Sequence, residues 1–164
     1  MTNQSNRTAV ITGAGDGIGR ALAINLNSRG IDLYLCDIDR ERLDATAGML
    51  NSDGVTVSTA VVDCGNREQI ETWAEMICAE NDSLDFLFNN AGVGYASPFR
   101  DASLENFEWL MNINYWGVVW STKAFLPLLE ASPAGHLVNI SSIFGMVGIA
   151  TQSAYNSAKF AVRG

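Results

Sequence analysis

The sequence has few cysteines and histidines, the residues that form disulfide scaffolds and metal sites. Its 164 residues include three cysteines and one histidine, and also only three prolines. Cys36, Cys64 and Cys78 are odd in number and lack the C-x-x-C spacing of metal ligands, so we expect reduced thiols, as in a cytoplasmic protein. His136 stands alone and is interpreted as a hydrogen-bonding residue at a loop end. We therefore predict no metal site.

Long apolar runs and basic segments are also missing. No stretch approaches the roughly 18 apolar residues of a membrane span, and residues 1–6 lack the apolar centre of a signal peptide. Ten Lys and Arg against eighteen Asp and Glu give a net charge of −8, which repels phosphate backbones and anionic membranes. We expect no nucleic-acid partner, no membrane partner and a cytoplasmic location.

The remaining pattern is a regular alternation of strands and helices in one domain, residues 1–164. Apolar or β-branched runs predict strands at residues 8–12, 31–36, 55–62, 84–88 and 137–140. Helical periodicity predicts helices at residues 18–28, 40–50, 68–80 and 104–130, and another from residue 153. Asn66 and Gln69 have the spacing of a capping box. This alternation favours the α/β class with a doubly wound, parallel, Rossmann-type sheet.

A glycine cluster follows the first predicted strand and opens a helix. Gly13, Gly17 and Gly19 form G-x-x-x-G-x-G rather than the common G-x-G-x-x-G. Glycines at such a turn let backbone N–H groups approach a pyrophosphate, and the helix N-terminus favours negative charge. The position predicts a dinucleotide site, although glycine clusters also form ordinary turns.

Two aspartates bear on the choice of cofactor. Asp37 ends the second predicted strand, 18 residues after Gly19, close to the roughly 20 expected for the carboxylate that binds the adenosine ribose. Asp16 adds negative charge near the same ribose. Both would repel a 2′-phosphate, so NAD is favoured over NADP. An additional interpretation is that Asp37 caps the next helix.

Tyr155 and Lys159 are four residues apart and share one face of the last predicted helix. A phenol is ordinarily too weak an acid to act as a base at neutral pH, but a neighbouring ammonium favours the phenolate. The pair could therefore serve as a general acid/base between an alcohol and a carbonyl. The alternative is a solvated helix face.

Six motifs in order resemble the short-chain dehydrogenase/reductase family of NAD(P)-dependent enzymes. They are TGAGDGIG (12–19), Asp63, NNAG (89–92), Asn114 in NINYWG, Ser142 in NISS, and YNSAK (155–159). The resemblance covers residues 8–164 and implies the strand order 3-2-1-4-5. It also implies a homo-oligomer for the full-length parent.

The resemblance implies roles for individual residues. Tyr155 would be the general acid/base, Lys159 would favour its phenolate and bind the nicotinamide ribose, Ser142 would polarise the substrate carbonyl, and Asn114 would hold Lys159 through a water. Ser141 is interpreted as a buried hydrogen-bonding neighbour. The implied cofactor contacts are Gly13, Asp16, Gly17, Ile18, Gly19, Asp37, Asp63, Asn90, Gly92, Tyr155 and Lys159.

Chains of this family usually continue with a sixth strand, a substrate lid and a seventh strand. We therefore expect a domain that lacks its C-terminal strands and is truncated at its C-terminal end, with weak adenosine binding and slow or no turnover by these 164 residues alone. The first functional hypothesis is an NAD-dependent oxidoreductase acting on an alcohol or ketone. The alternative is a truncated, non-catalytic dinucleotide-binding fragment of such an enzyme.

Two apolar segments have open interpretations. Residues 143–150 would either line a lipophilic substrate or pack as an apolar loop in the core. Trp109, Ile113, Trp116 and Trp120 form a stripe in the predicted helix 104–130, interpreted as core facing the sheet, with a subunit interface as the alternative.

Overall fold

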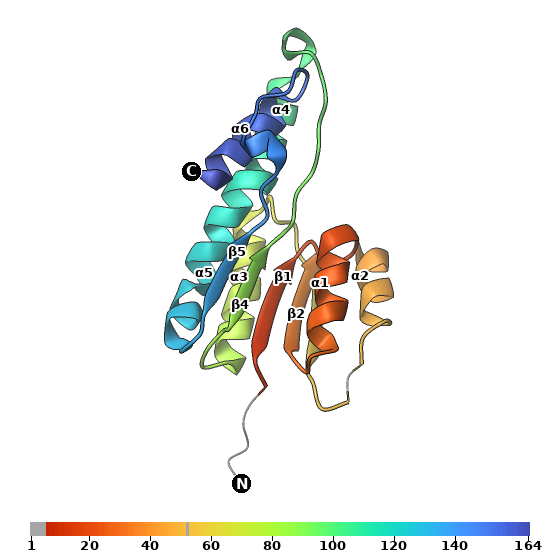
Figure 1. Ribbon diagram of the computed structural model, residues 1–164, viewed down its shortest axis with the longest axis vertical. Coiled ribbons are helices and arrows are strands. Elements are labelled where there is room, and N and C mark those ends of the chain that lie inside the picture. Colours follow the sequence, from red (N-terminus) through yellow and green to blue (C-terminus); the bar gives the residue numbers. More distant parts are fainter. Residues whose placement is uncertain (1–5, 52) are drawn as a thin grey trace.

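The computed structural model describes residues 6–51 and 53–164, which form a parallel five-stranded sheet between two layers of helices (Figure 1). The strands are β1 (Thr8–Thr12), β2 (Asp32–Asp37), β3 (Val57–Val61), β4 (Phe86–Asn89) and β5 (His136–Asn139). Their order is β3-β2-β1-β4-β5, and every neighbouring pair is parallel. The predicted Rossmann-type architecture and strand order are confirmed.

The helices divide between the two faces of the sheet. Helices α1 (Gly17–Asn27) and α2 (Arg40–Ala47) lie on one face, and α3 (Arg67–Glu80) and α5 (Gly117–Ala131) lie on the other. Each face of the sheet carries a hydrophobic core, and alternate residues of β1 pack into one or the other. Ala9 and Ile11 pack with α1 and α2, whereas Val10 packs with α3 and α5. A strand covered on both faces must be apolar throughout, which is why this strand lacks polar alternation.

The strand order fixes where a ligand can bind. The chain runs outward from β1 to β3 and then returns across the sheet to β4, on the other side of β1. A crevice forms at the carboxyl ends of parallel strands where the winding direction reverses, which here is between β1 and β4. The glycine cluster and the NNAG segment follow these two strands directly.

The predicted helix 104–130 is interrupted. It consists of α4 (Leu104–Met111), a π-helical turn at Asn112–Trp116, and α5. A π turn changes the helical phase, so a four-residue spacing no longer keeps side chains on one face. The core interpretation of the tryptophan stripe is wrong for Trp109 and Trp116, which are 45% and 42% exposed. Trp120 is partly buried against the core on the α3 and α5 side.

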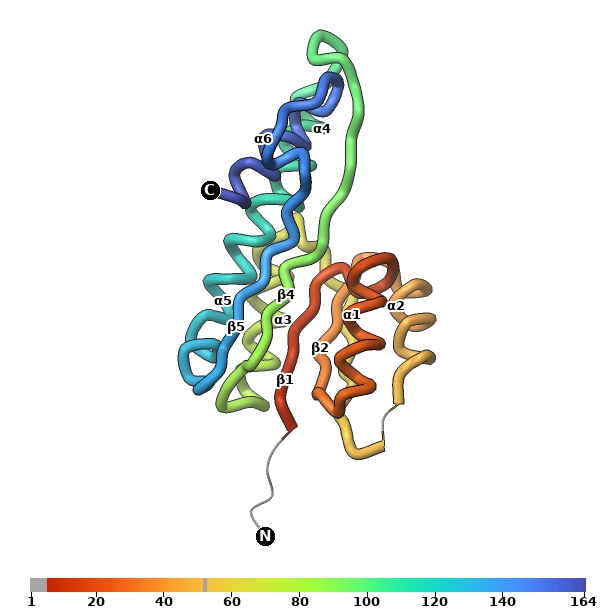
Figure 2. The backbone as a smooth tube through the Cα atoms, in the orientation of Figure 1, coloured from red at the N-terminus to blue at the C-terminus, as the bar shows by residue number. Residues whose placement is uncertain are grey.

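The last helix, α6 (Ser153–Arg163), begins where the sequence predicts it. The connection after β4 runs alongside the segment between β5 and α6 (Figure 2), and the Ser97 N–H donates to the Thr151 carbonyl across a distance of 2.8 Å. No helix within residues 6–51 and 53–164 combines the length and apolar character needed to cross a bilayer.

Candidate functional site

The loop from β1 to α1 needs glycine for close packing. A Cβ on Gly13 would lie 2.8 Å from the Ala91 Cα, and a Cβ on Gly19 would lie 2.0 Å from the Gly13 oxygen. Gly13 and Gly17 have φ angles of +66° and +52°, which favour glycine. A Cβ on Gly17 would meet nothing within 4 Å. Gly19 therefore serves the packing of α1, whereas Gly17 faces open space.

The start of α1 offers donors to a ligand. The Asp16 carboxylate accepts a hydrogen bond from the Gly17 N–H at 2.7 Å and caps the helix. The other N–H groups of a first helical turn have no partner within the helix. Ile18 follows directly, and its side chain is 58% exposed and lines a cavity. This helix end fits a pyrophosphate by its charge and by its donors.

Asp37, at the end of β2, is held by two backbone donors. The Gly15 N–H donates to Oδ2 at 2.8 Å, and the Asp39 N–H donates to Oδ1 at 3.0 Å. The interpretation of Asp37 as the cap of α2 is wrong, because Asp39 is the N-cap and accepts from the Arg42 N–H at 3.1 Å. Gly15 is a residue that the glycine motif missed, since a Cβ there would lie 2.8 Å from the Asp37 Oδ2.

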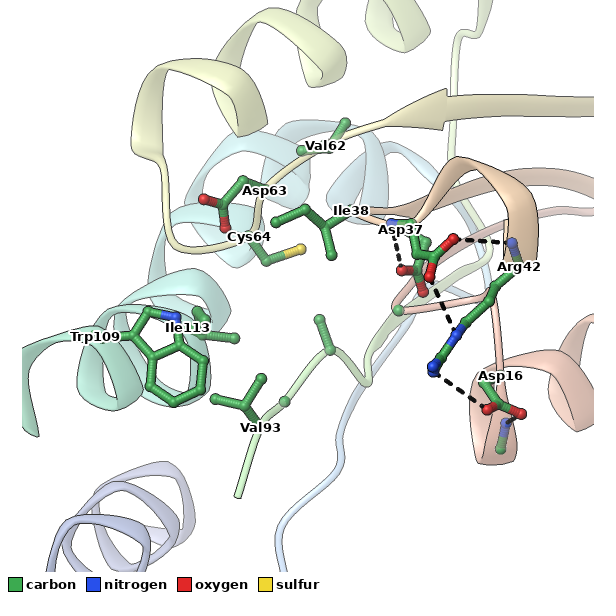
Figure 3. A pocket seen from close by; sticks show the side chains of 15 residues that line it. Asp16, Asp37, Ile38, Arg42, Val62, Asp63, Cys64, Val93, Trp109 and Ile113 are labelled. Atoms are coloured by element: carbon green, nitrogen blue, oxygen red, sulfur yellow. Dashed lines mark hydrogen bonds and ion pairs between the residues drawn. The ribbon is translucent and has the colours of Figure 1, made fainter. Parts of the chain in front are cut away.

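A cleft of about 570 Å³ connects these groups (Figure 3). Asp16, Asp37 and Arg42 lie at one end, and Val93, Trp109 and Ile113 lie at the other. Asp63 and Cys64, after β3, line the same cleft. The full set of lining residues is Gly13, Asp16, Gly17, Asp37, Ile38, Asp39, Arg42, Val62, Asp63, Cys64, Ala91, Gly92, Val93, Trp109 and Ile113.

Arg42 is a second residue that the motifs did not reveal. Its Nε lies 3.1 Å from the Asp39 Oδ2, and its Nη1 lies 3.5 Å from the Asp16 Oδ2. The guanidinium therefore partly balances the carboxylates at this end of the cleft. Its position in the first turn of the helix after β2 is the sequence feature that could have identified Arg42 as a residue of the cleft.

Asp63 is fixed by the turn that leads into α3. Its Oδ1 accepts from the Gly65 N–H at 2.8 Å, and its own N–H donates to the Gln69 Oε1 at 2.8 Å. Asn66 caps α3 by accepting from the Gln69 N–H at 3.2 Å, as predicted. The prediction of a complete capping box is wrong, because the Gln69 side chain accepts from the Asp63 N–H instead of the Asn66 N–H.

Asn90 ties the two strands at the crevice together. Its Nδ2 donates to the carbonyl oxygens of Thr12 and Gly13, both at 3.0 Å. The Thr12 hydroxyl accepts from the N–H groups of Asn90 and Ala91, also at 3.0 Å. Asn90 thus fixes the floor of the glycine loop, and it also lines a second cavity.

This second cavity, of about 490 Å³, holds the predicted catalytic side chains. Ser142, Tyr155 and Lys159 all line it. Gly92 and Val93 line both cavities, so the two cavities adjoin at this segment; together they are called the groove. Asn114 is not among the lining residues of either cavity.

Tyr155 and Lys159 lie one turn apart on α6. The Lys159 Nζ is 5.7 Å from the centre of the Tyr155 ring and donates to the Ile140 carbonyl at 2.8 Å. The Tyr155 ring packs edge-on against Phe144, with the centroids 5.8 Å apart. Because Lys159 is only 4% exposed, the alternative of a solvated helix face is wrong for this residue.

The two serines after β5 have different surroundings. The Ser142 Oγ accepts from the Phe144 N–H at 3.2 Å, which leaves the hydroxyl hydrogen available. The Ser141 Oγ donates to the Lys159 carbonyl at 3.1 Å, as its interpretation as a hydrogen-bonding neighbour predicts. The expectation that Ser141 is buried is wrong, because it is only partly buried and lines the same cavity as Ser142. A Cβ on Gly145 would lie 2.6 Å from that same carbonyl, so α6 packs directly against this turn.

Asn114 is fully buried inside the π turn. Its amide exchanges two hydrogen bonds with Val93: the Val93 N–H donates to Oδ1 at 2.7 Å, and Nδ2 donates to the Val93 carbonyl at 2.8 Å. A Cβ on Gly92 would lie 3.2 Å from the Asn114 Oδ1 and 3.6 Å from the Lys159 Nζ. Asn114 therefore fixes the segment that separates it from Lys159, and its water-mediated relay stays a prediction.

The apolar segment after Ser142 is not a core loop. Ile143, Met146, Val147 and Ile149 are between 41% and 61% exposed. The core-packing interpretation is therefore wrong for these four residues. His136 matches its interpretation as a loop-end residue, because its Nδ1 lies 2.6 Å from the Ala134 carbonyl oxygen.

Burial lowers the pKa of Lys159 below its usual range. The ammonium is therefore less favoured in the folded chain than in the unfolded one. The buried ammonium therefore destabilises the folded chain fully at a pH below the pKa that Lys159 has in the folded state. This destabilisation disappears as the pH rises through that pKa toward the ordinary value of 10.5. Wild-type stability relative to Lys159→Met should accordingly increase as the pH rises from neutral toward 10.5.

Urea unfolding of the two proteins at several pH values measures this difference. Lys159→Met also loses the hydrogen bond to Ile140, which lowers the free energy of unfolding by an amount that does not depend on pH. The test is therefore the change with pH in the stability difference between the two proteins, and not its absolute size. Lys123→Met, on the exposed side of α5, is the matched control for a lost lysine. A difference that stays constant with pH would contradict the prediction.

The profile described as short chain dehydrogenase matches residues 7–164. The chain belongs to the short-chain dehydrogenase family. A relative from Mycobacterium tuberculosis, which carries the provisional name oxidoreductase SadH, is 42% identical over 164 residues. The match covers 100% of this chain and 59% of the relative, so this short-chain dehydrogenase sequence spans about three fifths of that protein's length.

Solved structures of short-chain dehydrogenases are also similar. One from Burkholderia phymatum in complex with NAD has a TM-score of 0.90 and 34% identity, covering 99% of this chain and 58% of that one. A metagenomic short-chain oxidoreductase in complex with NADP has a TM-score of 0.91 and 32% identity, covering 98% and 73%. The family thus includes complexes with either cofactor.

Proposed function

We propose that the protein is an NAD-dependent oxidoreductase that interconverts an alcohol and a ketone, with Tyr155 as the general acid/base. The observation that carries the proposal is the pair of adjoining cavities in the groove, one lined by Asp37 and the other by Tyr155, Lys159 and Ser142. A groove with a capped helix end along its course suits an extended dinucleotide.

The residues of the groove fit NAD in their order. Asp37 would bind the adenosine ribose, and the α1 N-terminus with Gly13 and Gly17 would bind the pyrophosphate. Asp63 would lie beside the adenine, and Asn90, Gly92 and Lys159 beside the nicotinamide half. When bound, NAD supplies hydride transfer at its nicotinamide ring.

The protein's own groups supply the proton chemistry. The Tyr155 hydroxyl would give a proton to the ketone oxygen, or take one from the alcohol. The Lys159 ammonium uses one hydrogen on Ile140 and has others to stabilise the phenolate. The Ser142 hydroxyl, whose oxygen already accepts from Phe144, would donate to the same substrate oxygen.

A lipophilic substrate of medium size is part of this proposal. The exposed apolar residues Ile143, Met146, Val147 and Ile149 lie between Ser142 and Gln152, which both line the catalytic cavity. Apolar walls with a few convergent polar groups are typical of sites for small molecules.

The test is to incubate the protein with NAD and each of a panel of secondary alcohols and to measure the formation of NADH by its absorbance. NAD binding should be measured alongside, for example by quenching of tryptophan fluorescence, since Trp109 lines the cleft. Turnover is the expected result for the full-length protein, whereas slow or no turnover is expected for these 164 residues alone. Binding of NAD by the full-length protein without turnover of any alcohol or ketone would contradict the proposal and leave the non-catalytic alternative.

The preference for NAD depends on Asp37. Replacing it by asparagine removes the charge and one acceptor, so we expect the Kd for NAD to rise at least about tenfold, because hydrogen bonds to a charged group contribute about 1.5–3 kcal/mol. The Kd for NADP should change less or fall, since repulsion of the 2′-phosphate is relieved. Titration with both cofactors measures the ratio.

Asp44→Asn is the matched control, because Asp44 lies on the same helix as Arg42, is exposed and does not line the cleft. Asp44→Asn also removes one negative charge, and it should leave the affinities for NAD and NADP within about twofold of the wild-type values. An unchanged ratio of the two affinities in Asp37→Asn would show that Asp37 does not select the cofactor.

A further inference from the structure

Gln152 lies in the catalytic cavity without a role in the chemistry described above. It precedes Tyr155 by three residues and lines the same cavity as Tyr155 and Ser142. It occupies the N-cap position of α6, but its side chain makes no capping hydrogen bond to the helix. A primary amide carries both donors and an acceptor, so this side chain can bind a polar group of a ligand.

The turn before Gln152 is strained. Thr151 has a φ angle of +65° and is the one non-glycine residue with positive φ in the part of the chain that the structure describes. A β-branched residue in this region is an outlier that costs about 1–3 kcal/mol. Such strain persists only where the surrounding contacts impose it, and it is often found at binding sites.

The contacts that impose it come from both sides of the turn. The Ser97 N–H donates to the Thr151 carbonyl at 2.8 Å. The Asn156 Nδ2 donates to the Ile149 carbonyl at 2.8 Å, and the Asn156 N–H donates to the Gln152 carbonyl at 2.7 Å. The backbone of Gln152 is therefore held in place by α6 and by the connection after β4.

We propose that Gln152 is a specificity-determining residue that hydrogen-bonds a second, uncharged oxygen of the substrate. The substrate class is then a secondary alcohol or ketone with a hydroxyl or carbonyl near the reacting carbon. This inference rests on the proposed function, because it places the reacting oxygen between Ser142 and Tyr155.

An uncharged group is favoured by what surrounds it. The ionisable side chains that line this cavity are Tyr155 and Lys159, both assigned to the reaction, and no carboxylate or arginine lines it. A second charge on the substrate would meet no counter-ion there, whereas an amide satisfies a hydroxyl or a carbonyl. A site built to bind such a group also discriminates against analogues that lack it.

The test compares Gln152→Met with the wild type on matched substrates. Methionine keeps the length of the side chain and removes its hydrogen bonds. The substrate pairs are cyclohexanol with cyclohexane-1,2-diol, and 2-butanol with 2,3-butanediol, each oxidised with NAD. The wild type should prefer each diol, and Gln152→Met should lower kcat/KM for the diols about fivefold, mainly through KM, because one neutral hydrogen bond contributes about 1 kcal/mol.

The simple alcohols are the internal control, since their kcat/KM should stay within about twofold in Gln152→Met. Turnover of all four substrates with the same diol preference in both proteins would overturn the role of Gln152 and leave the proposed function intact. An equal fall for diols and simple alcohols would also overturn it, because it would reveal a general effect on the site. Absence of turnover with every pair in the wild type would count against the proposed function itself.

Discussion

Tyr155→Phe should lower turnover by roughly a hundredfold to ten-thousandfold, because a general acid/base contributes roughly 10²–10⁴-fold and phenylalanine has no proton to transfer. The affinity for NAD should fall by no more than about tenfold, because Tyr155 is one of many implied cofactor contacts and one hydrogen bond contributes about 1 kcal/mol. The groups assigned to the cofactor outside the reaction centre, Asp37, Asp63 and the start of α1, are untouched. The measurement is single-turnover NADH formation together with a binding titration.

The replacement should leave the fold intact. The Tyr155 ring packs edge-on against Phe144, and phenylalanine keeps this contact. Tyr115→Phe is the matched control, since Tyr115 lies in the π turn, packs in the same small apolar cluster and does not line the catalytic cavity. Turnover that survives in Tyr155→Phe would show that the general acid/base is misassigned.

Gly19→Ala should have the largest structural effect of a single methyl group in this chain. The new Cβ would lie 2.0 Å from the Gly13 oxygen and 2.7 Å from the Asn90 Nδ2. A backbone carbonyl cannot rotate away, so α1 must move relative to β1. Overpacking of this kind costs about 1–3 kcal/mol, and we expect about 3 kcal/mol because the obstacle is backbone.

The same displacement should impair cofactor binding at least tenfold, because the start of α1 carries the donors assigned to the pyrophosphate. Denaturant unfolding and NAD titration measure the two effects. Gly48→Ala is the control: a Cβ there would lie 3.5 Å from the Asp44 oxygen, an ordinary contact, so stability should change by less than about 1 kcal/mol. Equal stability of Gly19→Ala and the wild type would refute the packing role of Gly19.

The sheet could be predicted because its signals are local. Each buried parallel strand, such as Phe86–Asn89, is a short apolar run, and each crossover helix shows its own periodicity. The strand order needed the motifs as well, since apolar runs alone do not say which strands are neighbours. The motifs also predicted that Ser142, Tyr155 and Lys159 act at one site, and all three line one cavity.

Features that depend on contacts between distant segments could not be predicted. The π turn around Asn114 accompanies two hydrogen bonds to Val93, which lies 21 residues earlier in the chain. The link from Gly15 to Asp37 spans 22 residues, and no spacing rule marks it. The exposure of Trp109 follows from its place at the rim of the cleft, which helical periodicity cannot distinguish from a core position.

The most direct test of the whole arrangement is a crystal structure of the protein with both NAD and a ketone bound. The adenosine ribose should contact the Asp37 carboxylate, the pyrophosphate should lie at Gly17 and the start of α1, and the nicotinamide C4 should lie within about 4 Å of a substrate carbon held between Ser142 and Tyr155. A nicotinamide ring bound outside the cavity that contains Tyr155 and Lys159 would contradict the proposed oxidoreductase function.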